Sequence, residues 1–197
     1  MQTVVSLCRA EPDAITRICD SFAEFDDTGE ARAAGFLRRQ LFSYHDLLVQ
    51  VTDADEVTIP GLGAPFDATA TRFYRWDGKP ADPGQPLHST VIVNRMDPTV
   101  IPEVSALFAE LDATDFPHHM GTRRRQLFSL DGVYFHLQDF TTSDGYALID
   151  HAWKEADPRF IKICRELEPL VKVYDPASWR STADQVATRV YRWEVPA

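Results

Sequence analysis

The pattern of apolar and polar positions predicts a strand followed by a helix at the start of the second half of the chain. Residues 88–96 are rich in β-branched and apolar side chains, which favours a strand. Asp97-Pro98 then supplies a helix N-cap followed by proline at the first helical position. The apolar residues that follow recur at helical spacing and mark one face of an amphipathic helix: Ile101, Val104, Phe108 and Leu111.

A hairpin and a second helical region follow. Asp131-Gly132 separates two strand-like runs, and Asp-Gly in that position is one of the strongest hairpin signals. The elements predicted from here to the end are strands at about 122–130 and 133–139, helices at about 143–155 and 158–174, and a last strand at about 186–195. The resulting order, β-α-β-β-α-β, is the ferredoxin-like pattern.

The chain also contains an internal repeat. A shift of 86 residues aligns residues 2–51 with residues 88–137, and sixteen of those fifty positions are identical. Both copies share FAE-x-D-x-T followed by G-x-x-RRQLFS. A second matching pair is ATRFYRW at 70–76 and ATRVYRW at 187–193, identical at six of seven positions. Identity this dense predicts two copies of one structural unit.

The two copies differ in length. The second matching pair is offset by 117 residues rather than 86, so the first copy lacks 31 residues, and the Gly- and Pro-rich stretch Pro60–Pro65 stands in their place. Residues 78–87 are dense in Pro and Gly, which indicates a linker. We therefore expect a shortened, non-catalytic ferredoxin-like unit at 1–77, the linker at 78–87 and a complete unit at 88–197.

Composition narrows the range of partners and compartments. The net charge of −10 argues against nucleic acid or an anionic membrane as the main partner, because both favour basic surfaces. The three cysteines have no CxxC spacing, which indicates reduced thiols rather than a disulfide or zinc framework. The N-terminus does not resemble a signal peptide, and no apolar run reaches 18 residues. We expect a cytoplasmic protein.

The hairpin across Asp131-Gly132 places two ionisable side chains on one face. If the strands pair directly across the turn, Leu127 lies opposite His136. Two residues further from the turn, Arg125 lies opposite Gln138. Arg125 and His136 then share a face as diagonal neighbours. A strand arginine or histidine taken singly is more often structural, but burying both on one face is costly without a purpose.

Asp112, at the end of the helix before the hairpin, can fold over the same face and pair with either residue. His118 and His119 are adjacent and therefore point to different sides, so they do not form a metal site with His136. The sequence contains no dinucleotide fingerprint, P-loop, nucleophile elbow or HExxH motif. We therefore expect neither a metal nor a cofactor.

The segment 108–140, FAELDATDFPHHMGTRRRQLFSLDGVYFHLQDF, resembles the tetracenomycin-type aromatic polyketide cyclase family. The strings RRRQLFS and YFHLQDF together carry the resemblance, which extends over 88–197 and includes YDPASW at 174–179. Residues 2–76 resemble the same family as a shortened copy. The chain is therefore similar to a tandem fusion of two family units.

The resemblance implies an α+β fold in which two ferredoxin-like units form a dimeric αβ-barrel, here within one chain as a pseudo-dimer. It implies a cofactor-independent cyclase that closes a ring of a poly-β-ketone, or of a partly cyclised aromatic intermediate, by aldol condensation and dehydration. Type II polyketide synthase components are the implied protein partners. We expect the two sheets to face each other, with the site residues lining the closed cavity.

The positions that match the family's active-site residues are Asp112, Arg125 and His136. His136 would exchange protons, Arg125 would stabilise oxyanions and Asp112 would orient one of them. Leu111 stands where the family has a second histidine, which leaves His136 as the candidate imidazole at the core site.

The first copy lacks that imidazole. Asp26 and Arg39 match the aspartate and arginine of the second copy, but Gln50 stands in the place of the histidine, and glutamine does not exchange a proton near neutral pH. We expect one competent site in each chain, in the second copy.

Two other functions fit the same fold. A cofactorless anthrone-type monooxygenase shares the dimeric αβ-barrel, and oxygen consumption during turnover distinguishes it from a cyclase. A non-catalytic accessory subunit would steer the folding of the polyketide chain. Such a subunit would still direct formation of the same product after substitution of both Arg125 and His136.

Overall fold

The computed structural model describes residues 1–55, 65–79 and 85–195, and it divides the chain into two units. Unit 1 comprises Met1–Ala70 with Ala187–Ala197, and unit 2 comprises Thr71–Val186. Residues 60–64 of the expected Gly/Pro-rich loop and 80–84 of the expected linker lie outside the described residues.

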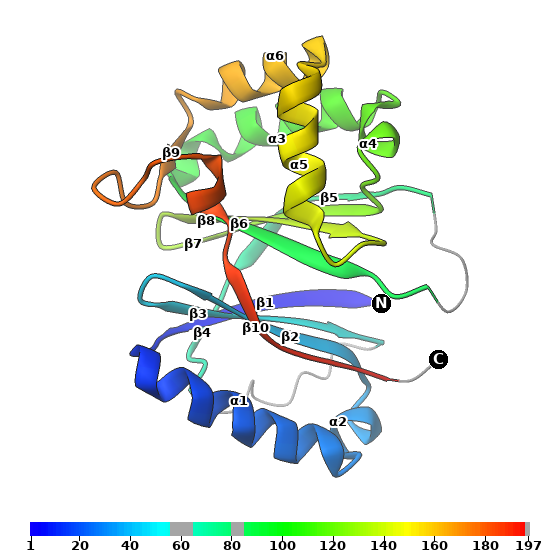
Figure 1. Ribbon diagram of the computed structural model, residues 1–197, viewed down its shortest axis with the longest axis vertical. Coiled ribbons are helices and arrows are strands. Elements are labelled where there is room, and N and C mark those ends of the chain that lie inside the picture. The colour runs from blue at the N-terminus through cyan, green and yellow to red at the C-terminus, as the bar shows by residue number, and fades with distance from the viewer. Residues whose placement is uncertain (56–64, 80–84, 196–197) are drawn as a thin grey trace. The chain divides into compact units, whose positions relative to one another are not determined.

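Unit 1 is an antiparallel five-stranded sheet with helices on one face (Figure 1). The strand order is β10-β2-β3-β1-β4. The strands are β1 (Gln2–Arg9), β2 (Phe36–Tyr44), β3 (Leu47–Ala54), β4 (Ala68–Thr69) and β10 (Thr188–Glu194), and the helices are α1 (Pro12–Asp27) and α2 (Glu30–Ala33).

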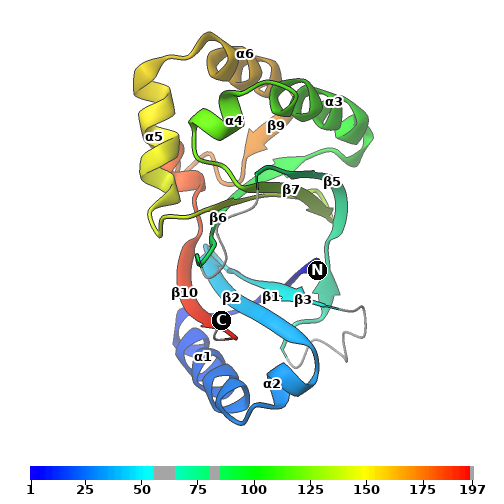
Figure 2. The same ribbon diagram turned by 90° about the vertical axis from the view of Figure 1, so that its right-hand side faces the viewer.

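Unit 2 has a sheet of the same design with a thicker helical layer, and Figure 2 shows α3, α5 and α6 over one face of it. The strand order is β5-β7-β8-β6-β9. The strands are β5 (Thr71–Asp77), β6 (His88–Met96), β7 (Arg124–Leu130), β8 (Val133–Phe140) and β9 (Val171–Val173). The helices are α3 (Ile101–Asp112), α4 (Phe116–His119), α5 (Gly145–Glu155) and α6 (Pro158–Leu167), with 3₁₀ turns η1 (Pro98–Val100) and η2 (Thr182–Gln185).

These two sheets confirm the α+β class and the organisation as a pseudo-dimer of ferredoxin-like units. The hairpin register is the expected one, with Leu127 opposite His136 and Arg125 opposite Gln138. None of the helices in the described part of the chain is long and apolar enough to cross a membrane.

One element differs from its prediction. The helix expected at 158–174 ends at Leu167, and Val171–Val173 instead forms strand β9, which pairs with β6. Pro169 accounts for this end, because proline has no N–H to donate to the carbonyl four residues earlier, so the helical hydrogen bonds stop after that of Glu168.

The unit boundaries also differ from those expected from the repeat, which were 1–77, 78–87 and 88–197. Each copy gives its last strand to the sheet of the other unit: β5, from the first copy, pairs with β7, and β10, from the second copy, pairs with β2. The physical reason is that β5 and β10 are nearly identical in sequence and pair with the same bulge, so the two edges accept either strand.

The RRQLFS motif places one arginine on each face of its strand, because successive side chains point to opposite faces. In unit 2, Arg124 Nε donates to Asp139 Oδ2 at 2.5 Å, and Ser89 donates to the other carboxylate oxygen at 2.5 Å. Arg38 and Asp53 form the same buried pair in unit 1. The first arginine of each motif is therefore a structural residue, since breaking a buried ion pair is strongly destabilising.

The exchange of strands predicts how a fragment of residues 88–197 will behave. Such a fragment loses β5 and keeps β10 without β2, so the β10 of one copy should pair with the β7 of another and give a symmetric dimer. Size-exclusion chromatography with light scattering measures this. A second fragment, 88–186, also lacks β10 and should aggregate. A well-folded monomer of 88–197 would contradict the prediction.

Candidate active site

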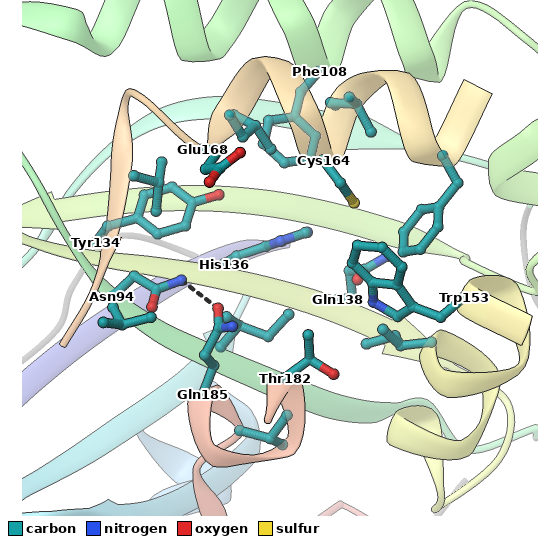
Figure 3. Close-up of a pocket in the computed structure, with 18 of the residues that line it drawn as sticks. Asn94, Phe108, Tyr134, His136, Gln138, Trp153, Cys164, Glu168, Thr182 and Gln185 are labelled. Atoms are coloured by element: carbon teal, nitrogen blue, oxygen red, sulfur yellow. Dashed lines mark hydrogen bonds between the residues drawn. The ribbon is translucent and has the colours of Figure 1, made fainter. Parts of the chain in front are cut away.

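The sheet of unit 2 and the helices above it line a cavity of about 940 Å³ (Figure 3). Its walls come from strands β6, β7 and β8 and from helices α3 to α6, with η2 at one side. Most of the lining side chains are apolar or aromatic, so the few polar groups among them stand out. A cavity of this size suits a multi-ring ligand.

The alternation of side chains along β8 brings its polar residues to this cavity. Tyr134, His136 and Gln138 follow one another at a spacing of two residues and all line it. Arg125, which pairs with Gln138 across the β7–β8 ladder, lines it as well. The cavity therefore lies on the helix-covered face of one sheet, and the expectation of a cavity enclosed by the two sheets is wrong for these residues.

Arg125 is 2% exposed, and its guanidinium lies close to two neighbouring polar side chains. Its Nη1 lies 3.4 Å from His136 Nε2, and its Nε lies 3.2 Å from Asp112 Oδ1 in an ion pair that lacks hydrogen-bond geometry. The ring of Phe108 lies 4.9 Å from the guanidinium carbon. Nη2 is buried and has no hydrogen-bond partner within the described residues, so it can donate to a ligand oxygen.

His136 is held in its neutral form. Burial, and after it the positive charge of Arg125, keep the pKa of His136 well below its ordinary value of 6.5. The ring packs edge-on against Phe108 at 5.0 Å between centroids. A neutral imidazole beside a guanidinium can accept a proton, and the resulting imidazolium is a strong acid because the adjacent charge disfavours it.

Asp112, the last residue of α3, is held from two sides. Tyr74 on β5 donates its hydroxyl to Asp112 Oδ2 at 2.9 Å, while Arg125 lies beside Oδ1. Burial raises the pKa of Asp112 above its ordinary 3.8, and the charge of Arg125 and the Tyr74 hydrogen bond act in the opposite direction.

Tyr74 is a residue that the sequence reasoning missed. It belongs to the first copy by sequence and reaches this site because β5 is exchanged. The signal that could have found it is the repeated segment ATRFYRW, in which the tyrosine recurs in both copies. Asp112, Arg125 and His136, which the sequence did indicate, are brought together.

Unit 1 contains the same triad in a tighter form. Arg39 Nη1 donates to Asp26 Oδ1 at 2.6 Å, and Tyr191 donates to Asp26 Oδ2 at 2.8 Å. Gln50, in the place of the histidine, turns to Thr52 at 2.9 Å. The guanidinium of Arg39 is also packed against three phenylalanine rings: Phe22, Phe25 and Phe36.

Comparison of the two triads shows which contacts both units share and which are specific to unit 2. Since aspartate, arginine and tyrosine meet in both units, this contact is a property of the fold. In unit 1 the arginine is hydrogen-bonded to the carboxylate at 2.6 Å, whereas in unit 2 Arg125 lies 3.2 Å from Asp112 without hydrogen-bond geometry and also lies 3.4 Å from His136. The histidine in the place of Gln50 is what distinguishes the site of unit 2 from the matching contact in unit 1.

Of the two adjacent histidines, only His118 lies near this site, where burial raises the pKa of Asp112 and His118 acts electrostatically to lower it. His118 packs against Trp76 with 5.4 Å between ring centroids, and His119 faces Asp115 at 3.4 Å on the surface. Within the described residues, no group of three or more His, Cys, Asp or Glu side chains is arranged to hold a metal ion.

A family model described as polyketide synthesis cyclase matches residues 2–64 and 88–194 of this chain. Polyketide synthase CurG of Streptomyces cyaneus is 32% identical over 108 residues, which cover 55% of this chain and 98% of that protein. Tetracenomycin F2 cyclase of Streptomyces glaucescens is 29% identical over 109 residues, covering 55% of this chain and 96% of that protein. Each relative is thus about as long as one copy of the repeat.

Two solved structures are also similar to this chain. Tetracenomycin F2 cyclase from Streptomyces glaucescens, described as a type-II polyketide cyclase, superposes with a TM-score of 0.51 at 30% identity and covers 55% of this chain and 99% of that chain. A Lactobacillus acidophilus protein named for a monooxygenase superposes with a TM-score of 0.58 at 8% identity, covering 98% of this chain and 97% of that chain. At that identity the second likeness shows the fold alone.

The paired triads predict a contrast between two matched variants. Tyr74→Phe and Tyr191→Phe each remove one hydrogen bond to a buried carboxylate, so each should lower the free energy of unfolding by about 2 kcal/mol in denaturant titrations. Tyr74→Phe should also lower catalytic turnover, because Asp112 then loses the group that holds it beside Arg125. Equal loss of turnover in both variants would contradict this assignment.

Proposed function

Because this chain belongs to the polyketide synthesis cyclase family, we propose that unit 2 is a cofactor-independent cyclase that closes a ring of a poly-β-ketone by aldol condensation and dehydration. The observation that carries the proposal is a neutral His136 beside a guanidinium with an unused N–H, on the wall of a largely apolar cavity.

The first step is removal of a proton from a methylene between two carbonyls. Such a proton is acidic enough for an imidazole of low basicity, so the lowered pKa of His136 is compatible with its role as base. The imidazole of His136 takes the proton, and the electron pair of the C–H bond moves onto the carbonyl oxygen to give an enolate. Arg125 Nη2 donates to that oxygen and stabilises its charge.

The enolate carbon then attacks a second carbonyl of the same chain, which forms the C–C bond and leaves an alkoxide. The imidazolium of His136 returns its proton to this alkoxide, and its proximity to Arg125 makes it a strong acid for the purpose. In the dehydration, His136 removes a second α-proton and transfers it to the departing hydroxyl group, which leaves as water. No net proton or electron is consumed.

Asp112 and Tyr74 have a positioning role in this scheme. Asp112 lies 3.2 Å from Nε of the guanidinium, and this ion pair helps to fix the position of Arg125 on the cavity wall. The apolar walls keep the chain folded in the conformation from which one carbon meets one carbonyl, which accounts for much of the rate and the regiochemistry.

Matched substitutions in the two copies test these roles. His136→Gln installs the residue of the first copy and should lower kcat/KM for cyclisation by about 10²–10⁴-fold. Arg125→Lys keeps the positive charge but removes the planar guanidinium with its several donors. It should lower kcat/KM for cyclisation by about 10²–10³-fold. Arg39→Lys is the control and should change activity little. Product analysis by liquid chromatography and mass spectrometry measures each rate. Wild-type rates from both unit 2 variants would overturn the proposal.

Two further measurements separate the alternatives. Cyclisation should proceed under anaerobic conditions, whereas a monooxygenase of anthrone-type substrates would stop and would consume oxygen when aerated. Control over which cyclised product forms should be lost in the Arg125/His136 double variant, whereas an accessory subunit would retain it.

Treatment with EDTA tests the absence of a metal cofactor. It should leave the rate of cyclisation unchanged, and restoration of a lost rate by a divalent metal would contradict the cofactor-independent scheme.

The depressed pKa of His136 predicts the shape of the pH profile. Protonation removes the base, so kcat/KM should fall as the pH falls through the pKa of the free protein, which lies well below 6.5. The profile should therefore stay level from about pH 8 down to about 6.5 and decline only below that. The residual rate of His136→Gln should lack this decline. A midpoint at or above 6.5 would contradict the assignment.

A further inference from the structure

One pair of amide side chains in the cavity has no part in the scheme above. Asn94 on β6 is 6% exposed, lines the cavity, and donates its Nδ2 to Gln185 Oε1 at 2.8 Å (Figure 3). Its Oδ1 is buried and finds no hydrogen-bond partner within the described residues. Leaving a buried acceptor unsatisfied costs about 1–3 kcal/mol, so an apolar residue would suit a purely structural position better.

The first copy of the repeat shows that the fold does not require this pair. Cys8 occupies the position of Asn94, because Cys8 pairs with Leu48 in unit 1 as Asn94 pairs with Tyr134 in unit 2. Cys8 packs there in a cluster of apolar side chains.

The partner amide is replaced as well. Val186 bridges Ile92 in unit 2 as Thr69 pairs with Ser6 in unit 1, so the residue equivalent to Gln185 is Ala68. Both amides are therefore absent from the copy that lacks the histidine. The pair accompanies His136 and the cavity rather than the ferredoxin-like framework.

The amide pair lies at the far end of the cavity from Arg125. Arg125 is at the level of Gln138 on the sheet, and Asn94 is at the level of Tyr134, two strands away. Strand spacings place the Cα atoms of Arg125 and Asn94 about 16 Å apart. In Figure 3, His136 lies between the amide pair on one side and Gln138 and Trp153 on the other. A ligand that touches both ends is extended and has several rings.

We propose that Asn94 and Gln185 form a specificity subsite that recognises a hydroxyl group at the end of the substrate distant from the proton-transfer site. Gln185 holds the amide so that Asn94 Oδ1 accepts a hydrogen bond from the ligand. A phenol or enol hydroxyl satisfies this acceptor, whereas an ether or a bare ring edge leaves it unpaired. The inference rests on the proposed function, and it assigns a substrate whose distal ring already carries such a hydroxyl.

Binding of three probes tests the subsite without any turnover: 2-hydroxyanthraquinone, 2-methoxyanthraquinone and anthraquinone. Quenching of the fluorescence of Trp153 and Trp179, which both line the cavity, gives the dissociation constants. The wild type should bind the hydroxyl probe at least about tenfold more tightly than the methoxy probe, because the site's acceptor is otherwise left unpaired. Asn94→Leu, of similar size, should abolish that preference, and Gln185→Leu should weaken it.

Control variants make the outcome specific. Ile92→Val changes an apolar wall residue and should shift all three dissociation constants together. Thermal unfolding checks that each variant is folded, and Asn94→Cys, which copies the first repeat, replaces Asn94→Leu if the latter is not. Equal wild-type affinity for the hydroxyl and methoxy probes, or a preference that survives in the folded Asn94 variant, would overturn the subsite.

The test also separates the two proposals. His136→Gln should keep the hydroxyl preference while losing cyclisation. If it keeps both, the proposed function fails and the subsite stands. If Asn94→Leu keeps the preference while His136→Gln loses cyclisation, the subsite fails and the proposed function stands.

Discussion

In each unit of this protein, an arginine and a tyrosine hold a buried carboxylate in place, and the arrangement of the site depends on this contact. In unit 2 the carboxylate is Asp112, and Tyr74 reaches it from the strand exchanged between the copies. Burial of the carboxylate is costly, which is why it requires both partners. The exchange of strands and the candidate active site are therefore linked, because β5, which adds an edge strand to the sheet of unit 2, also brings Tyr74 to this site.

Duplication supplies an internal comparison of what the fold needs and what the chemistry needs. In unit 1 the arginine is hydrogen-bonded to a carboxylate at 2.6 Å and packed against three aromatic rings, which indicates a structural role. In unit 2, Arg125 is shared with His136, and one of its donors is unpaired within the described residues. The ion pair is thus longer in unit 2 than in unit 1, and a histidine replaces a glutamine beside it. Under the proposed function, these two changes give Arg125 its role in stabilising an oxyanion.

The same comparison explains why the likeness to structures named for monooxygenases does not decide the activity. Those structures share the fold at 8–10% identity, and the Asp–Arg–Tyr contact recurs here even in the unit that lacks the histidine. The chemistry belongs to the side chains that the framework carries. Under the proposed function and the proposed subsite these are His136, Arg125 and the amide pair, all of which line the cavity of unit 2.

The sequence by itself determined the repeat, the order of elements and the hairpin register that places Arg125 beside His136, because turn chemistry and side-chain alternation act over a few residues. The sequence also showed that the first copy has glutamine, at Gln50, where the second copy has His136. It did not determine which sheet receives β5 or β10, since the two strands are nearly identical and either edge accepts either strand. Tyr74, Asn94 and Gln185 join the site through contacts between segments far apart in the chain, and only the tertiary structure decided those contacts.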